Sequence, residues 1–154
     1  YLGLCLGMQV ATIEFTRHIL KNNDVNSTEF DIKTANPVIH ILPGHDADED
    51  KGGTLRLGAY PCVLDKESLS YKAYGASKIS ERHRHRYEFN MDYKKPLEEA
   101  GMRFAGLSPD KRLVEIIELK DHPYFVASQF HPEFKSRPFR PHPLFRDFVK
   151  SSLR

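Results

Sequence analysis

Long apolar runs are absent from this chain of 154 residues, and so is a hydrophobic leader of the signal-peptide kind. A membrane helix needs about 20 consecutive, mostly apolar residues, so the sequence predicts neither a membrane span nor a membrane partner. Internal repeats and low-complexity segments are also missing, and 40% of the residues are hydrophobic. We therefore expect a single domain over residues 1–154 that is large enough to bury a core.

Cysteine and excess charge are both scarce. Cys5 and Cys62 are the only cysteines, too few for a disulfide framework, and a working thiolate needs a reducing compartment. We therefore expect a cytoplasmic location, with Cys62 a packing residue. The 23 basic and 21 acidic residues leave a net charge of +2. Nucleic-acid binding relies on a marked positive excess, so bulk electrostatics predicts no nucleic-acid partner.

Metal-site patterns are missing as well. Four of the histidines do not form a zinc-ligand spacing with the cysteines: His40, His45, His83 and His85. The acidic run 46–50 begins like a calcium loop, but Lys51 stands where glycine is required and Leu57 where a bidentate glutamate is required. We predict no metal, and a solvated acidic loop over residues 44–53.

The first feature that is present is Cys5, between Gly3 and Gly7 in the run Gly3-Leu4-Cys5-Leu6-Gly7. An apolar strand that turns sharply into a helix at this point would form a nucleophile elbow, with the glycines permitting the tight backbone. The helix N-terminus would favour an anion and lower the thiol pKa. Taken alone, a cysteine among apolar neighbours is more often a small core residue.

The second feature is His131-Pro132-Glu133. A strand directs residues i and i+2 to one face, which would set the His131 imidazole beside the Glu133 carboxylate. In that arrangement His131 takes the thiol proton of Cys5 and later returns it to a leaving amine, while Glu133 fixes the ring tautomer. The two motifs together favour covalent amide hydrolysis by a cysteine over a packing role for Cys5.

These residues resemble the class I, triad-type glutamine amidotransferases, whose elbow reads Gly-x-Cys-x-Gly-x-Gln and whose distal motif reads His-Pro-Glu. A narrower resemblance is to the C-terminal glutaminase domain of the CTP synthase family. It is carried by five segments spread over almost the whole chain: residues 1–9, 26–30, 52–58, 81–88 and 129–134.

The resemblance implies an α/β fold: an open, mainly parallel sheet with helices on both faces and a nucleophile elbow. It also implies that this chain is a partial domain, N-terminally incomplete, without the first strands and the glycine-rich loop that supplies a second oxyanion donor. Loss of one such donor typically costs about 10²–10³ in rate. We therefore expect the isolated chain to be a poor glutaminase.

The resemblance also implies roles for particular residues. Cys5, His131 and Glu133 would form the catalytic triad, and the Leu6 backbone N–H would bind the oxyanion. Glu29 would meet the α-ammonium of glutamine, and Arg86 its α-carboxylate, a task suited to a planar guanidinium. The predicted glutamine pocket comprises Leu6, Gly7, Met8, Gln9, Glu29 and Arg86. Arg56 would lie near the synthetase interface and the GTP effector.

The implied reaction is glutamine hydrolysis, with ammonia passing to a separate synthetase domain that aminates UTP to CTP. ATP, Mg and the GTP effector would serve the complete enzyme, which we expect to be a homo-oligomer, a tetramer. No cofactor is expected within this chain.

The apolar pattern predicts where helices and strands lie. We expect a helix from Leu6 to about Lys21, a short one near 67–74, one at 97–101 and a terminal helix beyond the proline-rich segment 137–143. Strands are expected at 37–43, 54–58, 59–64, 86–90, 102–107, 113–119 and 124–130.

The densest basic stretch is Arg82-His83-Arg84-His85-Arg86. As a strand it would put the three arginines on one side and the two histidines on the other. Without the resemblance it would be a solvated basic strand, and Glu29 would be a charge at a helix terminus or in a loop.

Two other classes of function stay open beside the glutaminase. The first is another cysteine amide hydrolase, such as a cysteine peptidase or a γ-glutamyl hydrolase. Glu29 and Arg86 argue against this class if these two residues bind the charges of a free amino acid. The second class is a non-catalytic, nucleotide-binding regulatory module, and ordinary slow reactivity of Cys5 toward iodoacetamide would favour it.

Overall fold

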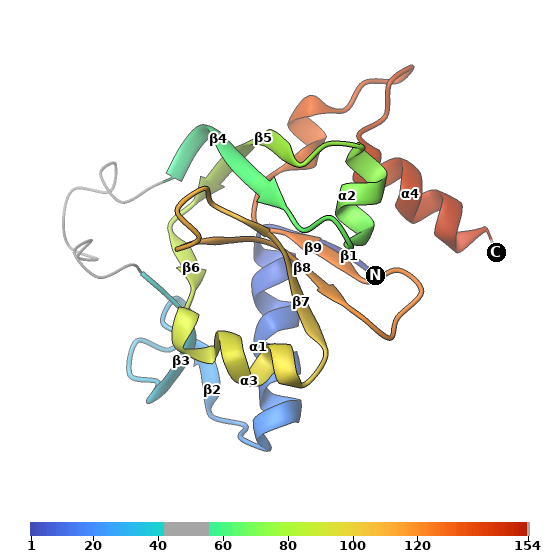
Figure 1. Ribbon diagram of the computed structural model, residues 1–154. Coiled ribbons are helices and arrows are strands. Elements are labelled where there is room, and N and C mark those ends of the chain that lie inside the picture. The colour runs from blue at the N-terminus through green and yellow to red at the C-terminus, as the bar shows by residue number, and fades with distance from the viewer. Residues whose placement is uncertain (42–55, 154) are drawn as a thin grey trace.

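The computed structural model describes residues 1–41 and 56–153 (Figure 1). Its strands are β1 (Leu2–Leu4), β2 (Val25–Ser27), β3 (Asn36–Ile41), β4 (Arg56–Leu64), β5 (Lys78–His85), β6 (Tyr87–Phe89), β7 (Met102–Leu107), β8 (Val114–Leu119) and β9 (Val126–Ser128). Its α-helices are α1 (Leu6–Leu20), α2 (Leu69–Tyr74), α3 (Lys94–Glu99) and α4 (Pro143–Ser152), and 3₁₀ turns span Met91–Tyr93 and Pro132–Lys135.

The strands form a six-stranded sheet in the order β1-β9-β8-β7-β4-β5 and a three-stranded sheet in the order β2-β3-β6. The expectation of a mainly parallel sheet is wrong for these strands. Only the pairs β1–β9 and β2–β3 are parallel among the described residues, and the other five pairs are antiparallel. The connections from β7 to β8 and from β8 to β9 are short, whereas a parallel pair needs a crossover of a dozen residues or more.

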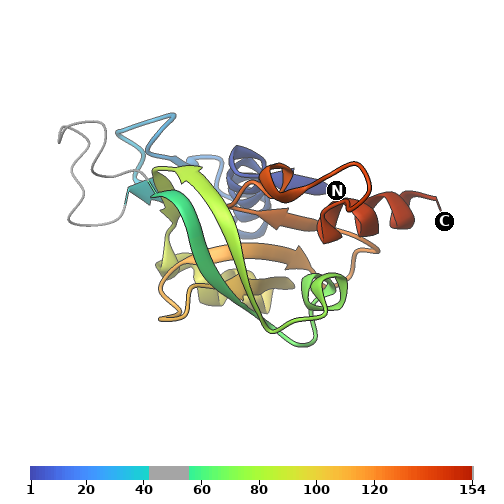
Figure 2. The ribbon, with the colours of Figure 1, turned by 90° about the horizontal axis from the view of Figure 1, so that it is seen from above.

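Helices cover both faces of the six-stranded sheet, as expected. Neighbouring residues of one strand, such as Ile116 and Ile117 of β8, enter two different hydrophobic clusters because successive side chains point to opposite faces. The cluster with Ile117 includes residues of α1 and α3, and the cluster with Ile116 includes residues of α2 and α4. Figure 1 shows the two pairs of helices on opposite sides of β7–β9, and Figure 2 shows the curl of the sheet from above.

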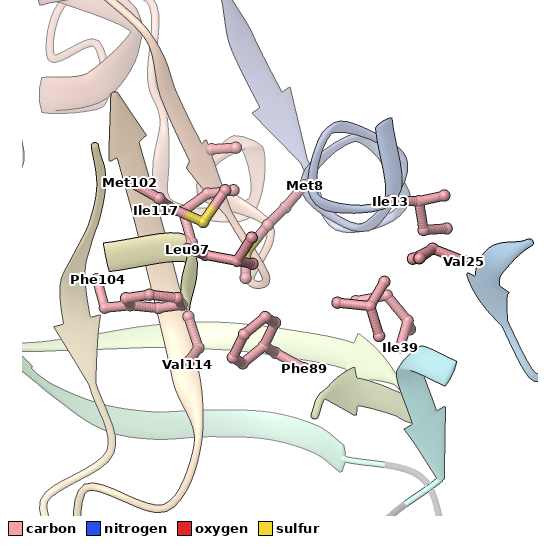
Figure 3. Packing of buried hydrophobic residues seen from close by; sticks show 12 residues of the cluster. Met8, Ile13, Val25, Ile39, Phe89, Leu97, Met102, Phe104, Val114 and Ile117 are labelled. Carbon is pink, nitrogen blue, oxygen red and sulfur yellow. The ribbon is translucent and has the colours of Figure 1, made fainter. Parts of the chain in front are cut away.

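The prediction of a helix from Leu6 to about Lys21 is confirmed by α1, which ends where Lys21 adopts the left-handed conformation. Met8 and Ile13 point from α1 into the core, toward Leu97 and Val25 respectively (Figure 3). The same buried face carries two threonines whose hydroxyls donate to carbonyls four residues earlier, which satisfies these polar groups inside the core. The packed face holds α1 rigidly behind the elbow.

Other element predictions were right in type and inexact in extent. The terminal helix is α4, with Pro143 in its first turn, where a missing N–H costs nothing. The third helix begins at Lys94 rather than 97, and the strands predicted at 54–58 and 59–64 are, where described, one strand. The predicted acidic loop 44–53 lies outside the described residues. None of the described helices has the length and apolar character needed to cross a membrane.

Candidate active site

The elbow is a single strained residue between β1 and α1. Cys5 has φ 49° and ψ −106°, a left-handed backbone that costs free energy for a residue with a Cβ. Its N–H donates to the Ser128 carbonyl at 2.7 Å. The expectation that the glycines supply the tight backbone is wrong, because neither has a positive φ. Gly3 instead permits close packing, since a Cβ there would lie 2.8 Å from a ring carbon of Tyr1 and 3.0 Å from the Cβ of Ala127.

The sheet order brings the two distant motifs to one edge. β1 and β9 are parallel neighbours with Leu4 opposite Ser128, so Cys5 follows one strand and the segment 129–133 follows the other at the same end. His131 is held there by its N–H, which donates to the carbonyl of Arg82 at 2.8 Å. Residues far apart in the chain therefore share the carboxyl edge of the sheet.

His131 and Glu133 form a close pair, with 2.7 Å between Nδ1 and Oε1. The predicted strand is wrong here: the 3₁₀ turn Pro132–Lys135 brings the carboxylate back to the ring. A carboxylate only accepts hydrogen bonds, so Nδ1 carries the proton. The other ring nitrogen, Nε2, is buried and has no hydrogen-bond partner among the described residues. Its lone pair is consequently available to take a proton.

The Cys5 thiol has a raised pKa, contrary to the expectation that the helix N-terminus would lower it. Burial is the largest cause, and the carboxylates of Glu29 and Glu133 raise the pKa further. The Leu6 N–H and the Gln129 amide act in the opposite direction by hydrogen bonding to the sulfur. Loss of water around the sulfur therefore outweighs the helix N-terminus in the unliganded protein.

A cavity of about 270 Å³ opens beside the elbow. Its lining residues come from the elbow and α1, the turn after β2, and the end of β5 with the start of β6: Cys5, Leu6, Gln9, Glu29, Arg84, His85, Arg86 and Tyr87. Most of the predicted pocket is thus brought together. Gly7 and Met8 do not line it: Met8 is fully buried in the core, and its N–H already donates to the Cys5 carbonyl at 3.0 Å.

The family model for class I glutamine amidotransferases matches residues 1–151. The chain belongs to the class I glutamine amidotransferase family.

The chain is similar to curated CTP synthases. It is 61% identical to the CTP synthase of Chloroflexus aurantiacus and 60% identical to that of Geobacillus kaustophilus, with 99% and 100% of the chain aligned. It spans only 28% and 29% of the lengths of those relatives. Among solved structures it is similar to the Trypanosoma brucei CTPS glutaminase domain with bound acivicin, at a TM-score of 0.90 and 37% identity, covering 99% of this chain and 60% of that one.

The basic segment of this amidotransferase follows the predicted alternation only in part. Arg82 and Arg84 are exposed while His83 and His85 are buried, as a strand requires. Arg86 has left the strand and stands at a bend, where it lines the cavity. The sequence did not predict three further lining residues: Arg84, His85 and Tyr87. Their position next to Arg86 in the chain could have indicated them.

A buried charge network lies behind this segment. Arg56 bonds Glu88 at 3.1 Å and Glu115 at 2.9 Å, and its guanidinium stacks on Tyr60 at 4.6 Å from the ring centroid. The side chain of Arg56 is 13% exposed. The effector role of Arg56 stays a prediction; in the structure its guanidinium bonds the side chains of Glu88 and Glu115.

Glu88 makes the stability of this network depend on pH. Burial raises the pKa of Glu88 from 4.5 to about 8, and the nearby Arg56 offsets only part of that effect. The folded state therefore holds a proton that the unfolded state releases above pH 4.5, so stability falls as pH rises toward 8. We expect urea unfolding to show a loss of about 1–2 kcal/mol between about pH 6.5 and pH 8.

The matched variant for this prediction is Glu88→Gln, which keeps the shape of the side chain and stays neutral. Its unfolding free energy should be flat over the same pH range. A wild-type protein that is equally flat would show that Glu88 is ionised throughout.

Proposed function

We propose that this chain hydrolyses glutamine through a Cys5–His131–Glu133 triad, as the ammonia-generating part of a longer protein that converts UTP to CTP with ATP. The proposal rests on the residues that line one cavity. A thiol, a carboxylate and a guanidinium line it together in Cys5, Glu29 and Arg86. A free amino acid with a side-chain amide presents the complementary groups, namely an ammonium, a carboxylate and an electrophilic carbon.

The first half of the reaction makes a thioester. His131 Nε2 accepts the proton of Cys5, and the sulfur attacks the side-chain carbonyl carbon of glutamine. The Leu6 N–H, which already points to the sulfur, donates to the oxygen as it gains charge. His131 then gives its proton to the amide nitrogen, the carbon–nitrogen bond breaks, and ammonia leaves. Glu133 stabilises the imidazolium between these steps.

The second half restores the enzyme. A water molecule gives a proton to His131 Nε2 and adds to the thioester carbon. The carbon–sulfur bond breaks, glutamate departs, and the sulfur recovers its proton from the imidazolium. Ammonia is the product that the synthetase domain of the longer protein would consume, where ATP with Mg activates UTP and GTP acts as the effector.

Binding of the substrate ammonium to Glu29 would also change the pKa of the Cys5 thiol. The Glu29 carboxylate raises the pKa of the Cys5 thiol in the empty cavity. An α-ammonium bound to Glu29 neutralises that charge, so the thiol becomes easier to ionise when glutamine is present. A peptide lacks this free ammonium beside the reacting amide, which favours glutamine over a peptidase substrate.

The test is alkylation of Cys5 by iodoacetamide in the full-length protein, followed by mass spectrometry. Glutamine should slow the alkylation, whereas a peptide with an internal glutamine should not. In Glu29→Gln the protection by glutamine should be lost, because a neutral amide binds the ammonium poorly. The same variant should be alkylated faster than wild type when no ligand is present, because the carboxylate that raised the thiol pKa is gone.

These outcomes separate the candidate functions. Equal protection by peptides would favour a cysteine peptidase, and protection by γ-glutamyl peptides would favour a γ-glutamyl hydrolase. Slow alkylation at the rate of an ordinary thiol, unaffected by glutamine, would favour a regulatory module.

A further inference from the structure

The carbonyl of Tyr87 determines which way two buried amides face. It can only accept hydrogen bonds, and the Gln9 side-chain nitrogen lies 3.2 Å from it. That end of Gln9 is therefore the NH₂ group. The same nitrogen lies 3.1 Å from Oε1 of Gln129, which must be an acceptor. The chain of bonds leaves the NH₂ group of Gln129 facing away from Gln9.

The NH₂ group of Gln129 faces the sulfur of Cys5, with 3.8 Å between Nε2 and Sγ. This distance suits a donor to sulfur, which is a larger and softer acceptor than oxygen. Gln129 is fully buried, and Gln9 is 2% exposed, so packing prevents either amide from turning freely. The bond from Gln129 lowers the thiol pKa against the burial that raises it.

We propose that Gln129 is a further catalytic residue, a neutral donor that stabilises the Cys5 thiolate, and that Gln9 positions it by fixing the orientation of its amide from the Tyr87 carbonyl. This inference rests on the proposed role of Cys5 as the nucleophile. It also changes the role expected for Gln9, whose amide nitrogen is engaged by Gln129 and Tyr87 rather than by the substrate.

Two donors at the sulfur allow a division of tasks. The Leu6 N–H donates to the substrate oxygen when the tetrahedral intermediate forms, and it then no longer stabilises the sulfur. The side-chain carbonyl of Gln129 accepts a hydrogen bond from Gln9, so the NH₂ group of Gln129 stays at the sulfur in both halves of the reaction. During hydrolysis of the thioester the sulfur leaves with the electron pair of the carbon–sulfur bond, and Gln129 stabilises that developing anion.

The experiment is the rate of Cys5 alkylation by iodoacetamide as a function of pH in the full-length protein. Gln129→Met removes the donor and keeps the length of the side chain. We expect the pKa read from the rate profile to rise by about one unit, equivalent to about tenfold less thiolate below the pKa. The plateau rate at high pH should stay the same. Gln9→Met should give a smaller rise, because the Gln129 carbonyl then loses the hydrogen bond that fixes the orientation of its amide.

Ser128→Ala is the matched control. It removes a buried hydrogen bond from the neighbouring residue, whose hydroxyl donates to the Phe130 carbonyl at 3.0 Å, and it leaves the sulfur untouched. Its alkylation pKa should equal that of wild type. An unchanged pKa in Gln129→Met, or a rate reduced equally at every pH, would overturn the proposal and leave Gln129 a structural residue. Glutamine protection of wild-type Cys5 is scored separately, so failure of the proposed function itself is recognised by its loss.

Discussion

Glutamine-dependent CTP formation by the full-length protein should fall by about 10⁴-fold or more when Cys5 is replaced by alanine. The sulfur forms the covalent bond to the substrate, and no other group in the cavity can replace it. Synthesis from added ammonia should persist at the wild-type rate, because that route bypasses the elbow. The two rates are measured side by side with glutamine and with an ammonium salt.

The control for this change is Cys62→Ala. Cys62 is also a free cysteine, but it is buried in the core and does not line the cavity. Its loss should leave both routes active. Glutamine-driven turnover that survives in Cys5→Ala would refute the nucleophile assignment, and loss of the ammonia route as well would point to a folding defect.

The largest loss of stability is expected for Arg56→Met. Glu115 is fully buried, and removal of Arg56 leaves its carboxylate without a cation, whereas Glu88, with its raised pKa, is largely protonated at neutral pH. Breaking a buried ion pair in this way typically costs about 3–5 kcal/mol. Urea denaturation of the two proteins at neutral pH measures the difference. The Met side chain keeps most of the volume of the arginine stem, so the cost reflects charge rather than a cavity.

Arg103→Met is the matched surface change. Arg103 pairs with Asp65 at 3.2 Å, and both side chains are partly exposed, so solvent screens the pair. Its loss should cost less than about 1 kcal/mol. Glu115→Gln added to Arg56→Met should recover part of the large loss, because one unpaired charge is then removed. If Arg56→Met and Arg103→Met cost the same, the network behind the cavity is not held by buried charge.

Elements with a strong local pattern were predictable from the sequence. The helix after Cys5 and the apolar strands at 102–107 and 113–119 follow from periodicity, because a buried face repeats along the chain. Strand direction was not predictable from those patterns, since an apolar run reads the same in a parallel or an antiparallel sheet. The mainly parallel sheet expected from the resemblance was therefore wrong for the described strands.

The same contrast holds for the site: residues in short motifs were predictable from the sequence, whereas residues placed by tertiary contacts were not. Cys5, His131 and Glu133 could be singled out because each stands in a short motif with a chemical meaning. Gln129 stands two residues before His131, just past the end of β9. It lies in a segment that carries the resemblance, but its residue type and spacing predicted no role for it. Its importance depends on Gln9 and Tyr87, which lie far from it in the chain and approach it only in the folded state.

The sequence by itself determined the identity of the reactive groups, since thiol, imidazole and carboxylate are fixed by residue type, and it determined the helix that follows the nucleophile. Only the tertiary structure decided the environment of those groups. The pKa of Cys5 is raised because the fold removes water from the sulfur and brings Glu29 and Glu133 near it. Desolvation and the field of distant charges depend on three-dimensional packing, which no local pattern of residues encodes.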